Sequence, residues 1–395
     1  MSTSLAIIIL LGLLANIIFT KINLPGLLGM LLLGMVLGPY VLDLISPDLL
    51  RVSADFRQIA LIIILLRAGM GIGSDDLKKV GSPALKLSCI PGLFEGFTIA
   101  YISTKVLGFS FIEGGILGFI IAAVSPAVVV PAMLDFQERR LGTNKGIPTL
   151  ILAGASIDDV FAITIFTTFI GLYSGSHVNI GVQILNIPIS IILGVILGTI
   201  IGFIMVRIFE KYHIRDTKKV LLILGSAILL TALEKFLKNS VEIAGLLGVM
   251  AIGFIILEKR PVVAKRLSHK FNKIWIFAEI LLFVLVGAQV NISVAFNAGL
   301  NGLLIIFIGL IARSIGVIIS LLGTNLNWKE RLFCTIAYIP KATVQAAIGA
   351  VPLALGVKSG EIILAIAVLS ILVTAPLGAI GIKATGKRLL EIEKK

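Results

Sequence analysis

Two adjacent acids, Asp158 and Asp159, stand inside an apolar stretch that runs from about residue 147 to residue 173. At a rise of 1.5 Å per residue, Asp158 would lie roughly 18 Å along a helix through this stretch. Two carboxylates so close together and partly out of water cannot both ionise comfortably, so we expect a coupled pair that can trade a proton for a cation. Neighbouring residues on a helix point about 100° apart, which favours two different roles. The alternative is that both acids only neutralise buried bases.

Three further charges, Glu95, Arg313 and Lys341, fall near the middle of other apolar segments. An ionisable group at such a depth in a membrane is a functional candidate by default. Glu95 and Arg313 are expected to form a structural ion pair between two halves of the molecule, with direct ion contact as the alternative. Arg67, in the run LLRAGMG, either pairs with an acid or extends to the membrane surface.

The elements that position these charges are long apolar segments. The chain is 58% hydrophobic and only 14% charged, with a mean hydropathy of +1.09. Soluble domains carry about a quarter charged residues, so this composition excludes a water-soluble globule. Several segments reach the roughly 20 residues that a membrane-spanning helix needs. The sequence therefore predicts an all-α membrane protein with about 13 transmembrane helices.

The basic residues concentrate in alternate connections between these segments. By the positive-inside rule, this bias places the N-terminus outside and the C-terminus in the cytoplasm of a cell (inner or plasma) membrane. It also accounts for the formal charge of +13 without a nucleic-acid partner. No connection is long enough for a soluble catalytic domain, so we expect the chemistry to take place within the lipid bilayer.

Two of the apolar segments are interrupted by proline. One reads AAVSPAVVVPAM and contains Ser125, Pro126 and Pro131; the other reads IPKATVQAAIGAVP and contains Pro340 and Pro352. Proline frees backbone carbonyls, which are tolerated at membrane depth only beside a cavity or a protein partner. Paired interruptions in the two halves of a transporter indicate its midplane site, whereas either alone could be a simple kink.

The order of these features predicts inverted repeats with two interrupted helices that cross. Thr343 and Gln345 are expected to line the crossing with Ser125 and Pro126 and to supply neutral oxygens, with ordinary helix packing as the alternative. The predicted division of the chain is 1–80 (N-terminal spans), 81–173 (first repeat), 174–297 (linking spans), 298–383 (second repeat) and 384–395 (short cytoplasmic tail).

The motifs together resemble the monovalent cation:proton antiporter superfamily. The segment LPGLLGMLLLGMVLGP is similar to the second-span motif of the superfamily. The segments LLRAGMG, GASIDDV and IPKATVQAAIG resemble the NHA branch of sodium/hydrogen exchangers. The resemblance covers nearly the whole chain from about residue 20. It implies a sodium/proton antiporter fold and a homodimer in which a mobile core bundle lies beside a dimerisation domain. The two repeats, 81–173 and 298–383, would then form the ion-translocating core, 1–80 would serve mainly as dimerisation and scaffold spans, and 174–297 as linking scaffold spans.

The resemblance also implies roles for single residues. The second acid of the pair, Asp159, would be the main carboxylate for cation and proton, and the first acid, Asp158, would pair with Lys341. The family often has an acid between the two residues that are Ser125 and Pro126 here, and this chain has none. One cation ligand of the family is therefore missing, which leaves ion preference open.

We expect a transporter, not an enzyme, that exchanges Na⁺ or Li⁺ for H⁺ by elevator-type alternating access at Asp159 and Asp158. It would need no cofactor besides the transported ions. The alternatives are a same-fold transporter of K⁺ or an organic ion, and a passive cation channel. An intramembrane aspartyl protease would need aspartates that face each other from separate helices. Electrogenic or electroneutral exchange, the pH profile, the role of Arg67 and the favoured state stay open at this point.

Overall fold

The computed structural model describes residues 1–22, 24–175, 180–237, 243–290 and 292–393. Their secondary structure is α-helical apart from one isolated antiparallel bridge between Leu141 and Ile392. Within these residues, nine helices are long and apolar enough to cross a membrane, and shorter apolar helices such as Gly26–Leu37 add to them. The all-α membrane fold is thus confirmed, while the count of about 13 spans stays a prediction.

The helices, in chain order, are α1 Ser2–Lys21, α2 Gly26–Leu37, α3 Pro47–Arg51, α4 Ser53–Gly69, α5 Ser74–Leu87, α6 Ile90–Val106, α7 Phe111–Ile121, α8 Pro126–Glu138, α9 Ile147–Tyr173, α10 Ile180–Lys211, α11 Asp216–Leu237, α12 Gly245–Lys259, α13 Pro261–Ala288, α14 Ile292–Ser320, α15 Trp328–Ala337, α16 Thr343–Ile348, α17 Val351–Ala354 and α18 Gly360–Leu389.

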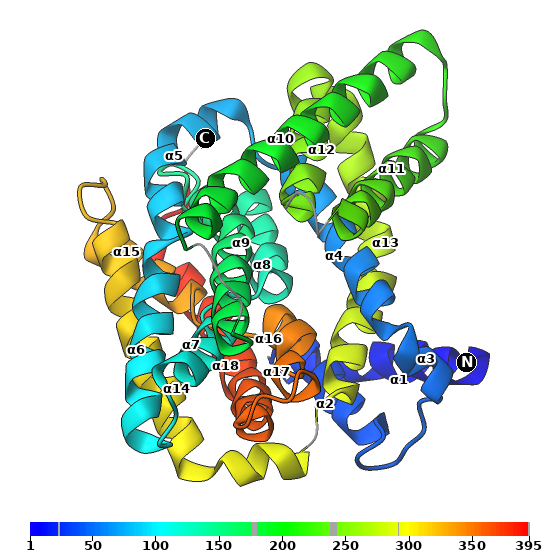
Figure 1. Ribbon diagram of the computed structural model, residues 1–395. Helices are drawn as coiled ribbons and strands as arrows, with labels where there is room; N and C mark the ends of the chain where they lie inside the picture. Colours follow the sequence, from blue (N-terminus) through cyan, green and yellow to red (C-terminus); the bar gives the residue numbers. More distant parts are fainter. Residues whose placement is uncertain (23, 176–179, 238–242, 291, 394–395) are drawn as a thin grey trace.

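These helices pack in two groups (Figure 1). In the first, which we call the core group, α6 packs on α7 and α14, α9 on α5, α7 and α8, and α18 on α14 and α15. In the second, the scaffold group, α13 packs on α2 and α4, and α12 packs on α4 and α10. The groups meet where α4 touches α8 and where α10 touches α9.

Glycines allow close packing inside the scaffold group. A Cβ on Gly34 of α2 would lie 2.1 Å from the carbonyl oxygen of Val284 on α13, and one on Gly287 would lie 2.1 Å from that of Leu31. Only glycine fits at such distances, and small residues of this kind drive helix association in lipid by letting backbones approach. Helices α2 and α13 of the scaffold group therefore pack backbone against backbone.

Both predicted interruptions are present in the core group. The backbone leaves the helix between Ile121 of α7 and Pro126 of α8, and again between Ala337 of α15 and Thr343 of α16. Pro126 occupies the first position of α8. A backbone N–H at this position has no partner within the helix, so its absence in proline costs no hydrogen bond. The prediction of two interrupted helices is confirmed.

Two helix boundaries differ from the sequence prediction. The apolar segment that predicts α13 begins near residue 274, but the helix begins at Pro261. Its first turns carry Lys265, Arg266 and Lys270, which have low hydropathy but high helix propensity. The apolar segment that predicts α2 extends to about residue 45, but the helix ends at Leu37, because Gly38 adopts an extended conformation ahead of a proline.

Candidate functional site

The two interruptions touch each other at the centre of the core group. The backbone N–H of Ser125, in the first interruption, donates to the carbonyl oxygen of Pro340, in the second, at 2.8 Å. Both residues are enclosed, and Ser125 has no exposed surface. The side chains that follow are therefore gathered around a crossing of two broken helices, as the sequence predicted.

Gln345 caps the C-terminal end of α7 by donating to its free carbonyl groups. It lies in α16 and is 2% exposed. Its amide nitrogen donates to the carbonyl oxygens of Ile120, Ile121 and Ala123 at 3.0, 3.2 and 3.0 Å. Carbonyls at the end of a broken helix need such partners inside a membrane. Because its nitrogen is held there, the side-chain oxygen of Gln345 has a fixed position.

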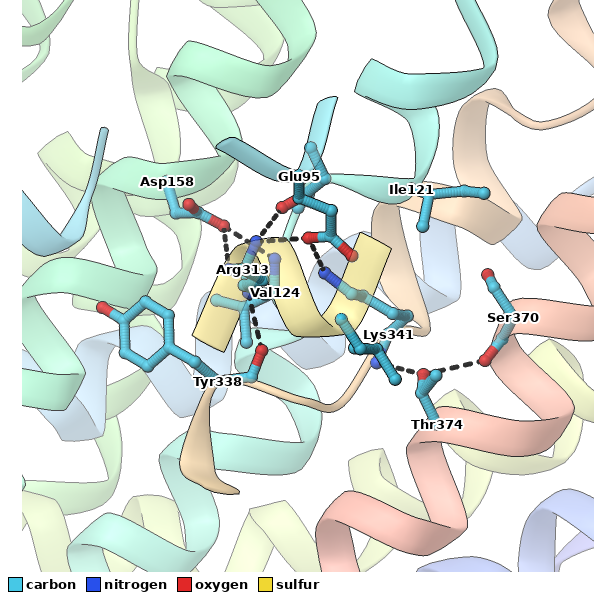
Figure 2. A network of polar contacts seen from close by, with 12 residues as sticks. Glu95, Ile121, Val124, Asp158, Arg313, Tyr338, Lys341, Ser370 and Thr374 are labelled. Atoms are coloured by element: carbon cyan, nitrogen blue, oxygen red, sulfur yellow. Dashed lines mark hydrogen bonds and ion pairs between the residues drawn. The ribbon is translucent and has the colours of Figure 1, made fainter. Parts of the chain in front are cut away.

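Arg313, on α14, is the centre of the polar network (Figure 2). Its guanidinium donates to the Tyr338 carbonyl at 2.7 Å and also to the Ala122 carbonyl, one acceptor in each interruption. It further bonds Glu95 Oε2 at 2.8 Å and Asp158 Oδ2 at 3.1 Å. The expected contact between Glu95 and Arg313 is present, and it is part of a larger network because a guanidinium has five donors.

Lys341 is not placed as expected. Its Nζ lies 2.6 Å from Glu95 Oε2, and the cation bonded to Asp158 is Arg313 instead (Figure 2). The expectation that Lys341 is the direct partner of Asp158 is therefore corrected. It treated the charges as two separate pairs, whereas one oxygen of Glu95 accepts from both cations.

Asp158, on α9, is held firmly. It is 1% exposed, and its Oδ2 accepts from the Val124 N–H at 2.7 Å as well as from Arg313. Its Oδ1 is buried without a partner in the described residues and borders a small cavity that Cys89 and Gly92 also line. These bonds fix one face of Asp158 and leave the other free.

Asp159 has a different environment. Its residue is half-buried, and its enclosed Oδ1 has no hydrogen-bond partner in the part of the chain that the structure describes. Asp158 therefore accepts two hydrogen bonds, from the Val124 N–H and from Arg313, whereas the enclosed Oδ1 of Asp159 accepts none from the described residues. This difference matches the split of roles that a spacing of 100° on a helix suggests.

Several other oxygens at the crossing also lack partners. Among the described residues, the buried side-chain oxygens without a hydrogen bond include Ser125 Oγ, Thr343 Oγ1 and Gln345 Oε1 in addition to the two aspartate Oδ1 atoms. Buried polar atoms without partners are rare in proteins, so their gathering at the crossing forms a candidate set of cation ligands. All five come from residues that the sequence proposed for the site; Pro126, the remaining one, starts α8 beside them.

The charges of the network do not cancel. The network contains three carboxylates, Glu95, Asp158 and Asp159, but only two cations, Arg313 and Lys341. Arg313 bonds Glu95 and Asp158, and Lys341 bonds Glu95. An isolated buried carboxylate is strongly disfavoured unless a proton or a cation neutralises it. The arrangement can therefore bind one or the other at Asp159.

Sequence reasoning missed three groups of the network. Val124 contributes its N–H to Asp158, Tyr338 places its ring 5.3 Å from the guanidinium of Arg313, and Thr374 accepts the Lys341 N–H at 2.9 Å. The Thr374 hydroxyl donates onward to the Ser370 carbonyl at 2.7 Å. Two small hydroxyls one turn apart in an otherwise apolar segment are the signal that could have identified α18 as part of the site.

Two crossing broken helices, inverted repeats and buried charges at the crossing define a class: a membrane transporter with the antiporter architecture. Residues 6–388 match the family "Sodium/hydrogen exchanger, transmembrane", and the chain belongs to this family.

Curated relatives agree with this assignment. The chain is 34% identical to human "Sodium/hydrogen exchanger 9B2" over 385 residues, which cover 93% of this chain and 70% of that protein. It is 32% identical to human "Sodium/hydrogen exchanger 9B1" over 388 residues, which cover 93% of this chain and 73% of that protein. The similarity thus spans nearly all of this chain and more than two thirds of each relative.

The fold has a counterpart among solved structures. The sodium proton antiporter MjNhaP1 from Methanocaldococcus jannaschii superposes with a TM-score of 0.79 over 98% of this chain and 97% of that chain, at 23% identity. This match confirms the antiporter fold that the sequence predicted.

Proposed function

We propose that this protein exchanges Na⁺, or Li⁺, for H⁺ across a membrane, and that Asp159 binds either the cation or the proton. The observation that carries the proposal is the set of buried, unpartnered oxygens at the crossing, two of them from carboxylates. Relatives named as sodium/hydrogen exchangers and a sodium proton antiporter of the same fold support the same conclusion.

The two acids have separate tasks in this mechanism. Asp158 keeps its charge because the Val124 N–H and Arg313 both bond it, and an arginine does not lose its proton in proteins. Asp159 takes up a proton or a cation, with neutral oxygens such as Thr343 Oγ1 and Gln345 Oε1 completing the shell around the cation. Occupation by one excludes the other, and this exclusion couples the two fluxes.

The core group would carry the site across the membrane by moving against the scaffold group. The network supports such a movement as one body, because Arg313 joins α6, α9 and both interruptions. Lys341 bonds Glu95 and can stay charged through the cycle, which favours exchange of one proton for one monovalent cation. Alternating access then needs no rearrangement inside the network.

The remaining expectations belong to the same proposal. The transporter would act as a homodimer in a cell membrane, with its N-terminus outside and its C-terminus in the cytoplasm. It would use no cofactor and carry out no covalent chemistry. Oriented cysteine labelling on either side of the membrane would test the orientation, and the mass of the purified complex would test the dimer.

The test of the function is reconstitution into liposomes that contain a pH-sensitive dye. Addition of Na⁺ or Li⁺ outside vesicles with an acidic lumen should raise the internal pH, and Asp159→Asn should abolish this response. Asp135→Asn is a matched control, because Asp135 pairs with Arg139 on the surface of α8 at 2.8 Å, away from the crossing. A passive channel would show a cation current without proton movement.

Two results would contradict the proposal. Proton movement at the wild-type rate in Asp159→Asn would remove Asp159 from the site. Proton movement driven equally by K⁺ or by an organic cation, with no preference for Na⁺ or Li⁺, would keep the fold but change the substrate.

A further inference from the structure

Arg67 joins the scaffold group to the core group. It lies in the last turn of α4, and its Nη2 bonds Glu138 Oε1, at the end of α8, at 2.9 Å. Helix α4 belongs to the scaffold group and α8 is half of the first interrupted helix. This ion pair therefore crosses the boundary along which the two groups would slide.

The two partners are unequal. The side chain of Arg67 is 9% exposed, whereas that of Glu138 is 67% exposed. Gly69, two residues after Arg67, is packed so tightly on α12 that a Cβ there would lie 2.0 Å from the Met250 carbonyl oxygen. The arginine is thus enclosed within the scaffold group, while the glutamate is mostly exposed at the end of α8.

A second acid, within the scaffold group, interacts electrostatically with Arg67. Glu279 is half-buried and lies on α13, which packs on α4. It makes no hydrogen bond or ion pair with any residue that the structure describes, although α4 and α13 pack closely together. A buried arginine that lost the acid it bonds would be strongly disfavoured unless a second acid replaced that partner.

We propose that Arg67 is a latch with two alternative partners: it holds the core group through Glu138 in the conformation described here and transfers to Glu279 when the core group moves. The inference rests on the proposed alternating access. The exposed Glu138 returns to water after release, so the enclosed cation is compensated in both states. The latch then sets the fraction of molecules in the described conformation and the rate at which the core group moves out of it.

Three variants in proteoliposomes test the latch, in a background in which Cys89→Ser and Cys334→Ser remove the native thiols. Spin labels attached through Asn144→Cys, in the connection after α8, and Val262→Cys, at the start of α13, report the distance between the two groups. Glu138→Gln should deplete the distance component of the described conformation. Glu279→Gln should enrich that component and slow exchange at least tenfold. Asp135→Asn, one turn before Glu138 and paired within α8, should change neither.

A charge swap separates a latch from a purely structural ion pair. Arg67→Glu combined with Glu138→Arg restores the bridge between α4 and α8 but places the new glutamate beside Glu279. The double variant should therefore enrich the distance component of the described conformation, as Glu279→Gln does, and exchange should be at least tenfold slower than in the wild type. A wild-type distance distribution together with wild-type exchange in the double variant would overturn the latch. Displacement of the distance in the same direction by Glu138→Gln and Glu279→Gln would also overturn it. Absence of exchange in the wild-type protein would instead overturn the proposed function.

Discussion

The two inverted repeats share a pattern of helices and hydrogen bonds but differ in the charged side chains that they carry. In the first repeat the N–H of Val124 donates to a carboxylate, Asp158 of α9; in the second the N–H of Lys341 donates to a hydroxyl, Thr374 of α18. Val124 and Lys341 follow the first residues of α7 and α15 by the same number of positions. An equivalent backbone hydrogen bond thus joins each interruption to the long helix that follows it, α9 or α18. Only in the first repeat is the acceptor an acid.

The resemblance continues to the helix starts. Ser110 and Glu113 form a capping box at α7, and Asn327 and Glu330 form one at α15. Each glutamate also accepts a bond from the other repeat, just before the long helix of that repeat. Glu113 accepts from Ser359, before α18, at 2.9 Å, and Glu330 accepts from Lys145, before α9, at 2.9 Å. The frame is therefore duplicated down to single hydrogen bonds, and the first repeat adds the acids while the second adds Arg313 and Lys341.

The largest expected difference between the repeats is at their equivalent acceptors. Asp158→Asn should abolish exchange and destabilise the protein by about 3–5 kcal/mol, because Arg313 loses a charged partner in a buried network. Thr374→Val removes one neutral bond, and should cost about 1 kcal/mol while exchange continues. Exchange rates in proteoliposomes and thermal unfolding in detergent measure both. Equal losses in the two variants would contradict the division into a chemical and a structural repeat.

Glu95 comes next, since one of its oxygens accepts from both cations. Glu95→Ala leaves Arg313 and Lys341 facing each other without this acid, so we expect a loss of stability of about 3–5 kcal/mol. Thermal unfolding in detergent checks it, and Glu95→Gln, which keeps the shape, separates charge from packing. An unchanged melting temperature together with lost cation binding would instead make Glu95 an ion ligand.

Lys341→Gln should have a smaller effect. It removes one positive charge from the second repeat, so the remaining acids hold a proton more easily and the pH profile of exchange should move to higher pH. Asp158 retains Arg313, so exchange itself should persist. The pH dependence of the dye response measures the shift. An identical profile would show that Lys341 does not act on the acids electrostatically.

The smallest effects test whether the frame is truly shared. Ser110→Ala and Asn327→Ala each remove one capping side chain, which typically costs about 1 kcal/mol. Because the two caps are equivalent, both variants should lower the melting temperature by similar amounts and leave the Na⁺ dependence of exchange unchanged. A strong loss of exchange in only one of them would show that the repeats differ in more than their charges.

The sequence contained the elements and the charges, but not their pairing. Long apolar segments predict membrane helices from composition alone, and the prolines near Ser125 and Lys341 predict the two interruptions. Hydropathy alone predicts too late a start for α13, because the first turns of this helix are basic and resemble a loop in composition. The partner of Asp158 could not be chosen, because Arg313 and Lys341 are both distant in sequence and only the packing of α14 on α6 decides which cation reaches it.

The most direct test of the central claim is proton release on cation binding. Purified protein in a weakly buffered detergent solution should release protons when Na⁺ is added, at a pH where Asp159 is protonated, and Asp159→Asn should release none while still folded by its melting curve. Proton release from Asp159→Asn equal to that of the wild type would contradict the account, since the exchange of proton for cation would then take place elsewhere.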